Sequence, residues 1–128
     1  MDDKGVMFNK TWLYQGGSWY AFKSSGAMIS ADWLYDNGSW YYLKDSGSMA
    51  TGWLKDGGTW YYLKDSGSMA TGWIKDNGSW YYLKDSGAMA TGWIKDNGKW
   101  YYLASSGNML SNTRTPDGYY VDASGAWK

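Results

Sequence analysis

A repeat of 20 residues constrains the fold of this chain more than any other feature of its sequence. Tryptophan recurs at this spacing, and a second tryptophan follows each of the first set by seven residues. The first set is Trp33, Trp53, Trp73 and Trp93, and the second is Trp40, Trp60, Trp80 and Trp100. An earlier unit carries Trp12 and Trp19, with one extra residue before Trp33. Such a period predicts an array of small units rather than one globule.

Each unit is predicted to form a β-hairpin. The dipeptide Asn-Gly or Gly-Gly separates two short aromatic runs at 16–17, 37–38, 57–58, 77–78 and 97–98. A two-residue type I′ turn needs positive φ at both central residues, which these dipeptides supply. Alternation along the strands of one unit then predicts an aromatic face of Trp53, Trp60 and Tyr62 and an opposite face of Leu54, Tyr61 and Leu63.

Stacking of the hairpins follows from their small size, because one isolated hairpin is barely stable in water. The predicted fold is all-β, a solenoid of stacked β-hairpins with a repeat of about 20 residues. Residues 1–11 are interpreted as the tail of a preceding repeat, since Met7 stands five residues before Trp12 as Met28 does before Trp33. Residues 12–112 are expected to form five hairpins, and 113–128 a degenerate C-terminal capping hairpin.

Composition argues against several classes of function. Twelve basic residues balance twelve acidic ones, which removes the electrostatic drive for binding nucleic acid or an anionic membrane. Histidine and cysteine are both absent, so zinc, haem and a histidine-based triad lose their usual groups. No apolar run approaches the roughly 20 residues of a membrane span. We therefore expect no metal, cofactor, nucleic-acid partner or membrane insertion.

Catalysis is also not expected. The Asp residues recur at 36, 56, 76 and 96, just before turns, where Asp is favoured for local backbone hydrogen bonds. Paired catalytic carboxylates need unequal environments, whereas identical repeats provide equal ones. The chain is therefore predicted to be a binding module.

The 11 Trp and 13 Tyr allow two interpretations. Some rings should form the core of a thin solenoid, a role assigned to Tyr41, Tyr61, Tyr81 and Tyr101. The others would form a weakly hydrated notch at each junction between hairpins. Such a notch suits a quaternary ammonium ion, which donates no hydrogen bond and gains roughly 0.5–2 kcal/mol from each ring. Sugar stacking is the competing use, and composition does not separate the two.

The unit at residues 71–90, TGWIKDNGSWYYLKDSGAMA, resembles the choline-binding repeats of pneumococcal and related surface proteins and of their phages' lysins. The resemblance covers about residues 4 to 127, and Gly-Trp, Trp-Tyr-Tyr and Gly-x-Met recur in register. It implies a left-handed superhelix of β-hairpins that binds choline or phosphocholine of teichoic and lipoteichoic acids. It also implies an extracellular location, at the bacterial cell surface and in the cell wall.

Sites in this family combine two aromatic residues of one hairpin with one of the next, often with a Met. The resemblance implies five choline-binding groups: Trp12 and Trp19 with Tyr42; Trp33 and Trp40 with Tyr62; Trp53 and Trp60 with Tyr82; Trp73 and Trp80 with Tyr102; and Trp93 and Trp100 with Tyr120. The resemblance adds Met49, Met69, Met89 and Met109, for which packing is the alternative role. The middle three groups are favoured, because the last unit is shortened around Pro116.

Two other functions stay open at this point. A carbohydrate-binding repeat, as in glucan-binding proteins and clostridial toxins, carries similar Gly-Trp and Tyr-Tyr pairs. A structural spacer or dimerisation tail would bind no ligand, and a homodimer through the C-terminal end is a related alternative. The favoured hypothesis is a multivalent wall anchor, in which several weak sites engage one polymer.

Overall fold

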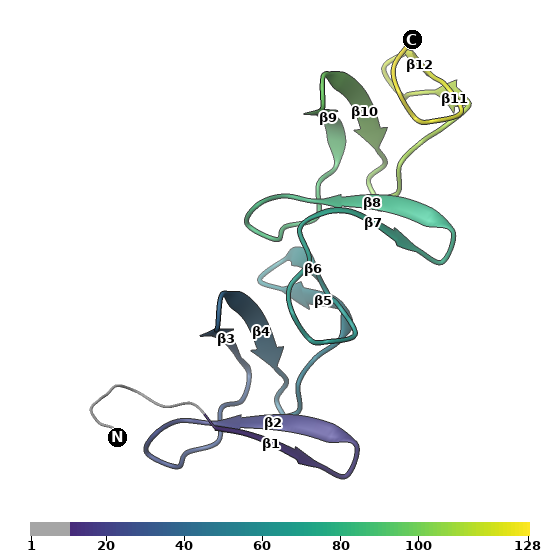
Figure 1. The fold of residues 1–128 in the computed structure, drawn as a ribbon. Helices are drawn as coiled ribbons and strands as arrows, with labels where there is room; N and C mark the ends of the chain where they lie inside the picture. The colour runs from purple at the N-terminus through teal and green to yellow at the C-terminus, as the bar shows by residue number, and fades with distance from the viewer. Residues whose placement is uncertain (1–10) are drawn as a thin grey trace. The chain divides into compact units, whose positions relative to one another are not determined.

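A computed structural model describes residues 11–128 of the chain (Figure 1). The tail expected to belong to a preceding repeat lies outside the described residues, except for residue 11. All regular elements from residue 11 onward are β-strands. In the same range no helix has the length and apolar character needed to cross a membrane.

Within residues 11–128, consecutive strands pair into six two-stranded sheets. The hairpins are β1 (Thr11–Gln15) with β2 (Ser18–Phe22), β3 (Asp32–Asp36) with β4 (Ser39–Leu43), β5 (Gly52–Asp56) with β6 (Thr59–Leu63), β7 (Gly72–Asp76) with β8 (Ser79–Leu83), β9 (Gly92–Asp96) with β10 (Lys99–Leu103), and the short β11 (Thr113–Arg114) with β12 (Tyr120–Val121). The prediction of an all-β fold built from hairpins that repeat about every 20 residues is confirmed. The handedness of the superhelix stays a prediction.

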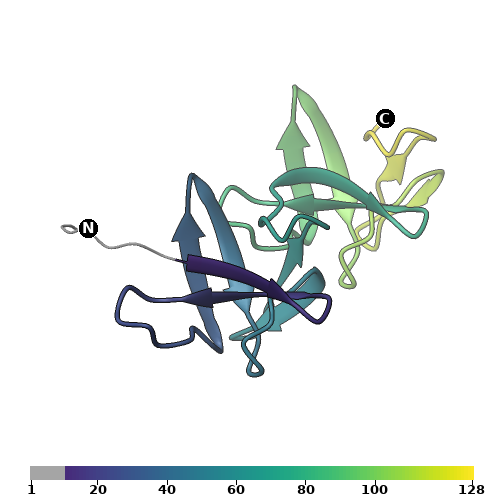
Figure 2. The same ribbon diagram turned by 60° about the horizontal axis from the view of Figure 1, so that its bottom comes forward.

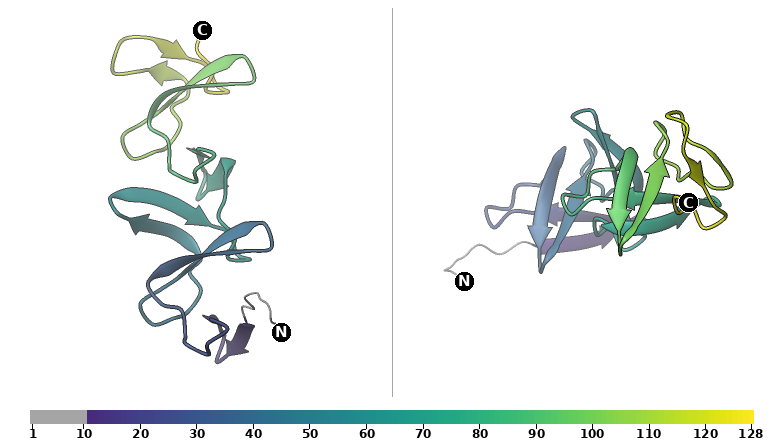
Figure 3. Two further views of the ribbon diagram at one scale, coloured as in Figure 1. Left: turned by 90° about the vertical axis from the view of Figure 1, so that its left-hand side faces the viewer. Right: turned by 90° about the horizontal axis from the view of Figure 1, so that it is seen from above.

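The described residues divide into two compact units. The first contains residues 11–54 and 62–69, and in it the β1/β2 ribbon runs across the β3/β4 ribbon (Figure 2). The second contains residues 55–61 and 70–128, and in it the β7/β8 ribbon runs across the β9/β10 ribbon (Figure 3). Within each unit, successive hairpins therefore cross rather than extend one another's sheet.

The strand register agrees with the predicted turns. In the β3/β4 hairpin, Trp33 pairs with Tyr42 and Leu34 pairs with Tyr41. The turn residues Asn37 and Gly38 have φ values of 52° and 87°, the positive pair that a type I′ turn requires. Because pairing across the turn fixes the register, the aromatic and aliphatic faces of the hairpin are separated as expected.

The core is a series of small aliphatic contacts, one for each hairpin. The last residue of the second strand is fully buried in five hairpins, at Leu43, Leu63, Leu83, Leu103 and Val121, whereas Phe22 at the end of β2 is half-buried. In the first unit, Leu43 packs with Ala21, Ile29 and Leu34, and Trp12 and Met49 cover this cluster. The interior is thin, so tryptophan and tyrosine rings supply much of the remaining packing.

The segment after each hairpin joins that hairpin to the one before it. The Met49 N–H donates to the Trp19 carbonyl at 2.8 Å, while the next N–H, of Ala50, donates to the Tyr42 carbonyl at 2.8 Å. The same pair of bonds recurs in the second unit, from Met109 to Trp80 at 2.8 Å and from Leu110 to Tyr102 at 3.0 Å. Neighbouring hairpins are thus linked through backbone groups.

The side chain of the same methionine packs over a glycine of the following loop. An added Cβ on Gly107 would overlap Met89 Sδ and would lie 2.9 Å from Met89 Cε. Equivalent contacts join Met28 to Gly47, Met49 to Gly67 and Met109 to Gly125. Glycine is needed at Gly107 for a second reason, because its φ is +96°. These contacts show that the repeated methionines pack between loops, whatever else they do.

We expect Gly107→Ala to destabilise the fold more than Gly98→Ala. Both glycines have positive φ, but nothing lies within 4 Å of a Cβ on Gly98. The backbone strain of alanine should cost each variant about 1–2 kcal/mol, and the overlap with Met89 should add about 1–3 kcal/mol at Gly107 only. Urea unfolding followed by Trp fluorescence measures the difference, and equal losses would show that the methionine contact contributes nothing.

Candidate functional site

The first tryptophan of a hairpin packs against the second tyrosine of the same hairpin. The Trp33 and Tyr42 rings meet edge to face, with centroids 5.1 Å apart. The corresponding separations are 5.1 Å for Trp53–Tyr62, 5.1 Å for Trp73–Tyr82 and 5.2 Å for Trp93–Tyr102. The shared face predicted for Trp53 and Tyr62 is therefore present. In the β1/β2 hairpin Ala21 takes the place of the tyrosine opposite Trp12.

The ring that the next hairpin contributes is the first tyrosine of its Tyr-Tyr pair. Tyr41 lies 5.3 Å from Trp12, Tyr101 lies 5.2 Å from Trp73, and Tyr119 lies 5.9 Å from Trp93, measured between ring centroids. The resemblance implies Tyr42, Tyr102 and Tyr120 in these three groups, so the ring that contacts the first tryptophan is one residue earlier than expected. The choline-binding role of the expected tyrosines stays a prediction.

Strand alternation explains this difference in ring contact. Tyr42 and Tyr102 lie across from the tryptophan of their own hairpin and pack against it. Tyr41 and Tyr101 point to the opposite face, which is the face that meets the preceding hairpin. Both were expected to be core residues only. At the other two junctions, Tyr62 and Tyr82 also pack within their own hairpins, and their assignment to Trp33 and Trp53 stays a prediction.

The two tryptophans of one hairpin stand nearly at right angles. The interplanar angle is 82° between Trp12 and Trp19 and 85° between Trp73 and Trp80, with centroids 6.5 Å and 6.4 Å apart. The second tryptophan is exposed, with 42% of Trp19 and 41% of Trp80 accessible to solvent. Together with the tyrosine of the next hairpin, the pair forms three walls around an open space.

Two such spaces are grooves with defined linings. The N-terminal groove, of about 380 Å³, is lined by Trp12, Trp19, Asp36, Tyr41, Met49 and Ser66. The C-terminal groove, of about 490 Å³, is lined by Trp93, Trp100, Asp117, Tyr119 and Trp127. Met49 thus reaches a groove wall as well as a loop glycine. In the C-terminal groove Trp127 stands at the position that methionine holds in the other repeats.

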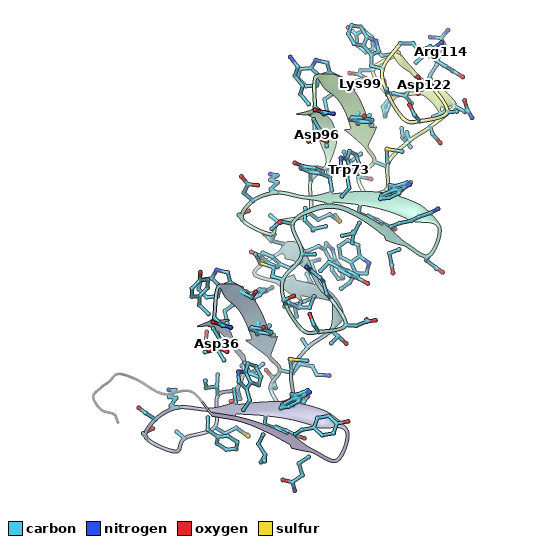
Figure 4. All side chains as sticks on the ribbon, in the orientation of Figure 1. Asp36, Trp73, Asp96, Lys99, Arg114 and Asp122 are labelled. Atoms are coloured by element: carbon cyan, nitrogen blue, oxygen red, sulfur yellow. The ribbon has the colours of Figure 1, made fainter. Side chains whose placement is uncertain are left out.

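A carboxylate from the next hairpin accepts a hydrogen bond from the first tryptophan. The indole Nε1–H of Trp73 donates to Asp96 Oδ2 at 3.0 Å, and the two residues lie between the β7/β8 and β9/β10 hairpins (Figure 4). Trp12 donates to Asp36 at 3.1 Å and Trp93 donates to Asp117 at 2.9 Å. We call Trp73, Trp80, Tyr101 and Asp96 the Trp73 cluster.

Sequence reasoning missed this role of the aspartates. Asp36 and Asp96 precede turns, which is sufficient reason for Asp at those positions. The signal that could have found them is the separation of 23 or 24 residues between each tryptophan and its carboxylate, which exceeds one repeat. Such a pairing is hard to recognise among similar repeats, because every Asp also has a constant sequence spacing from the tryptophans of its own repeat.

The carboxyl group of Asp117 is held in its ionised form. The hydroxyl of Thr115 and then the indole of Trp93 donate to it, and these bonds lower the pKa of Asp117 from its ordinary value. A groove with three or more aromatic walls and a fixed negative charge can hold a cation that offers no hydrogen bond. Among residues 11–128 there is no group of three or more acidic residues that could hold a metal ion.

The outer partner of the second tryptophan differs along the chain. Tyr14 lies 5.0 Å from Trp19 and Tyr35 lies 4.9 Å from Trp40, between ring centroids. In the next three hairpins a lysine takes this position. The Nζ atoms of Lys55, Lys75 and Lys95 lie 5.8, 5.9 and 5.9 Å from the ring centroids of Trp60, Trp80 and Trp100.

Comparison with known families and structures agrees with this geometry. A family model described as a choline-binding repeat matches residues 35–71 and 70–113, and a model of a cell wall binding repeat matches residues 10–28. The crystal structure of choline binding protein F from Streptococcus pneumoniae, with a peptidoglycan analogue, is similar. It is 50% identical over 91% of this chain and 39% of its own, with a TM-score of 0.83.

Two further solved structures are similar. The multimodular pneumococcal cell wall endolysin from phage Cp-1, complexed with choline, is 39% identical over 100% of this chain and 39% of its own, with a TM-score of 0.70. The choline-binding domain of another Streptococcus pneumoniae protein is 48% identical over 62% of this chain and 95% of its own, with a TM-score of 0.58. The search of curated proteins returned no significant match.

This chain spans about two-fifths of the length of choline binding protein F and of the phage endolysin. The choline-binding repeat model alone covers more than half of its residues. The chain therefore belongs to the choline-binding repeat family.

Proposed function

We propose that this chain is a non-catalytic module that anchors a protein to the bacterial cell wall by binding choline or phosphocholine of teichoic and lipoteichoic acids. The observation that carries this proposal is the N-terminal groove, where two perpendicular tryptophans meet a tyrosine and a carboxylate of the next hairpin. The same set of groups recurs at Trp73 and at Trp93.

A quaternary ammonium ion matches these groups in charge and in hydrogen bonding. Its methyl groups donate no hydrogen bonds, so ring faces and apolar contact must hold it. One oxygen of the Asp36 carboxylate is already bonded to the indole of Trp12, so the carboxylate acts on the ligand mainly through its charge. A sugar would instead need several free donors and acceptors around the rings. The family match and the similarity to an endolysin complexed with choline favour choline over a carbohydrate.

Repetition of a weak site is the expected source of strong attachment. Each groove is shallow and open, so each should bind choline weakly. When several sites engage one polymer, avidity can exceed the affinity of a single site by roughly 10²–10⁴. The similarity to a phage endolysin complexed with choline supports attachment of this kind at the cell surface. A homodimer through the C-terminal end stays a prediction, which sedimentation at several protein concentrations would test.

Choline should change the Trp fluorescence of the protein, whereas 3,3-dimethylbutan-1-ol should bind more weakly. The alcohol has the shape of choline but no charge, so it retains the apolar contact and loses the cation–π attraction of roughly 0.5–2 kcal/mol for each ring. Glucose oligomers are the third ligand of the titration. A response to the oligomers without a response to choline would replace this proposal with a carbohydrate-binding function.

Tyr101→Ala should remove one wall of the Trp73 cluster and weaken choline binding at that site about 2- to 30-fold, the range of one cation–π contact. Tyr102→Ala is the matched comparison, because Tyr102 packs against Trp93 within its own hairpin. It should lower stability more than it changes binding at Trp73. Calorimetric titration and urea unfolding of both variants separate the effects, and the reverse pattern would restore Tyr102 as the third wall.

Asp96→Asn should weaken choline binding at the Trp73 cluster about 1.5- to 5-fold, the range of an exposed charge interaction. The asparagine oxygen can still accept the hydrogen bond from the Trp73 indole, so the loss reports the charge. Asp96→Ala removes the hydrogen bond as well and should weaken binding further. Choline affinity in both variants is measured by NMR titration, from the shift of the Trp73 indole N–H signal. Unchanged affinity in Asp96→Asn would exclude an electrostatic role for this carboxylate.

A further inference from the structure

The residue beside the second tryptophan divides the hairpins into two electrostatic classes. In the β1/β2 and β3/β4 hairpins it is Tyr14 or Tyr35, whose neutral ring tilts against the indole. In the β5/β6, β7/β8 and β9/β10 hairpins it is Lys55, Lys75 or Lys95, whose ammonium lies over the indole. All five side chains are exposed. This position is therefore one of the differences in charge between the sites.

The strand register gives the charges at three matching positions of each site. In the N-terminal groove, Asp36 pairs across its turn with Ser39, and the position beside Trp19 is Tyr14, so these three positions carry one negative charge. At the Trp73 cluster, Asp96 pairs across its turn with Lys99. The position beside Trp80 there is Lys75, so the same three positions carry two positive charges and one negative charge. Asp76 follows Lys75 on its strand, where Gln15 follows Tyr14 in the first hairpin.

Choline and phosphocholine should respond to this difference in opposite directions. Choline is a cation, so an ammonium over the same indole lowers the attraction that the ring offers it. Phosphocholine carries an anionic phosphate close to its trimethylammonium group. A lysine ammonium has three donors on a flexible stem and can leave the ring to bind a phosphate oxygen. Tyr14 offers no positive charge, and Asp36 repels the phosphate.

We infer that Lys75 and Lys95 are specificity-determining residues, which make the sites of the β7/β8 and β9/β10 hairpins select phosphocholine over choline. The N-terminal groove, with Tyr14 in the same position, lacks this preference. The inference rests on the proposed function, because it assumes that these sites bind the trimethylammonium group. It adds that the repeats recognise both the trimethylammonium group and the phosphate of the ligand. Only the hairpins with lysine beside the second tryptophan recognise the phosphate.

The test measures affinity at each site by NMR, using the indole N–H signals of ¹⁵N-labelled protein assigned by single Trp→Phe variants. Choline and phosphocholine are titrated separately. The preference for phosphocholine at Trp80 should exceed that at Trp19 about 1.5- to 5-fold, the range of an exposed ion pair. The excess should shrink as salt is added, because exposed charges are screened.

Reciprocal variants assign the effect to one position. Lys75→Tyr should abolish the preference at Trp80, and Tyr14→Lys should create it at Trp19. Both substitutions introduce a side chain that other hairpins already carry there, so the fold accepts them. Lys84→Tyr changes an exposed lysine of the following loop and should leave both ratios unchanged. Lys99→Ser measures the contribution of the other lysine near this cluster.

The outcomes separate this inference from the proposed function. Equal ligand ratios at Trp19 and Trp80 with normal choline binding would overturn the inference alone. The same conclusion would follow if Lys99→Ser, but not Lys75→Tyr, removed the preference. If neither choline nor phosphocholine shifted any indole signal, the proposed function would be overturned.

Discussion

Backbone hydrogen bonds from the segment after each hairpin hold neighbouring hairpins together. A two-stranded ribbon cannot bury both of its faces, and its leucine contacts fill only a thin interior. Two successive N–H groups connect the ribbons. The N–H of Met49 donates to the preceding hairpin at Trp19, and the N–H of Ala50 donates to its own hairpin at Tyr42. This pair of bonds sets where the next hairpin lies, and therefore which side chains meet at a junction. The aromatic grooves are a consequence of that placement.

The two tyrosines of a Tyr-Tyr pair have different roles, which follow from this placement of one hairpin against the next. Tyr102 stabilises its own hairpin by packing on Trp93, while Tyr101 turns toward Trp73 of the hairpin before it. Asp96 reaches the same tryptophan from the strand that pairs with Tyr101 and fixes the edge of the indole. Trp73 is thus positioned by two hairpins, so an isolated unit would lack a complete site.

Local chemistry made the hairpins predictable from the sequence. Asn37-Gly38 requires the turn that the structure has, and alternation then separates the faces of Trp33 and Leu34 correctly. The third wall of each site was not predictable in this way, since it depends on which face of one hairpin contacts the next. A choice between Tyr41 and Tyr42 needs that contact, and both residues are equally aromatic. The carboxylate of Asp36 was missed for the same reason, because its partner lies in another repeat.

The extra residue of the first repeat shows where the chain tolerates a change of length. It lies after Met28 and before Trp33, downstream of the N–H of Ile29 that bonds to its own hairpin at Ala21. Ala31, with φ of 52°, makes the turn that Gly52, Gly72 and Gly92 make in later repeats. This extra residue leaves the inter-hairpin bond from Met49 to Trp19 intact. Divergence of repeat length in evolution should therefore concentrate in these few residues, while the spacing from second tryptophan to methionine stays constant.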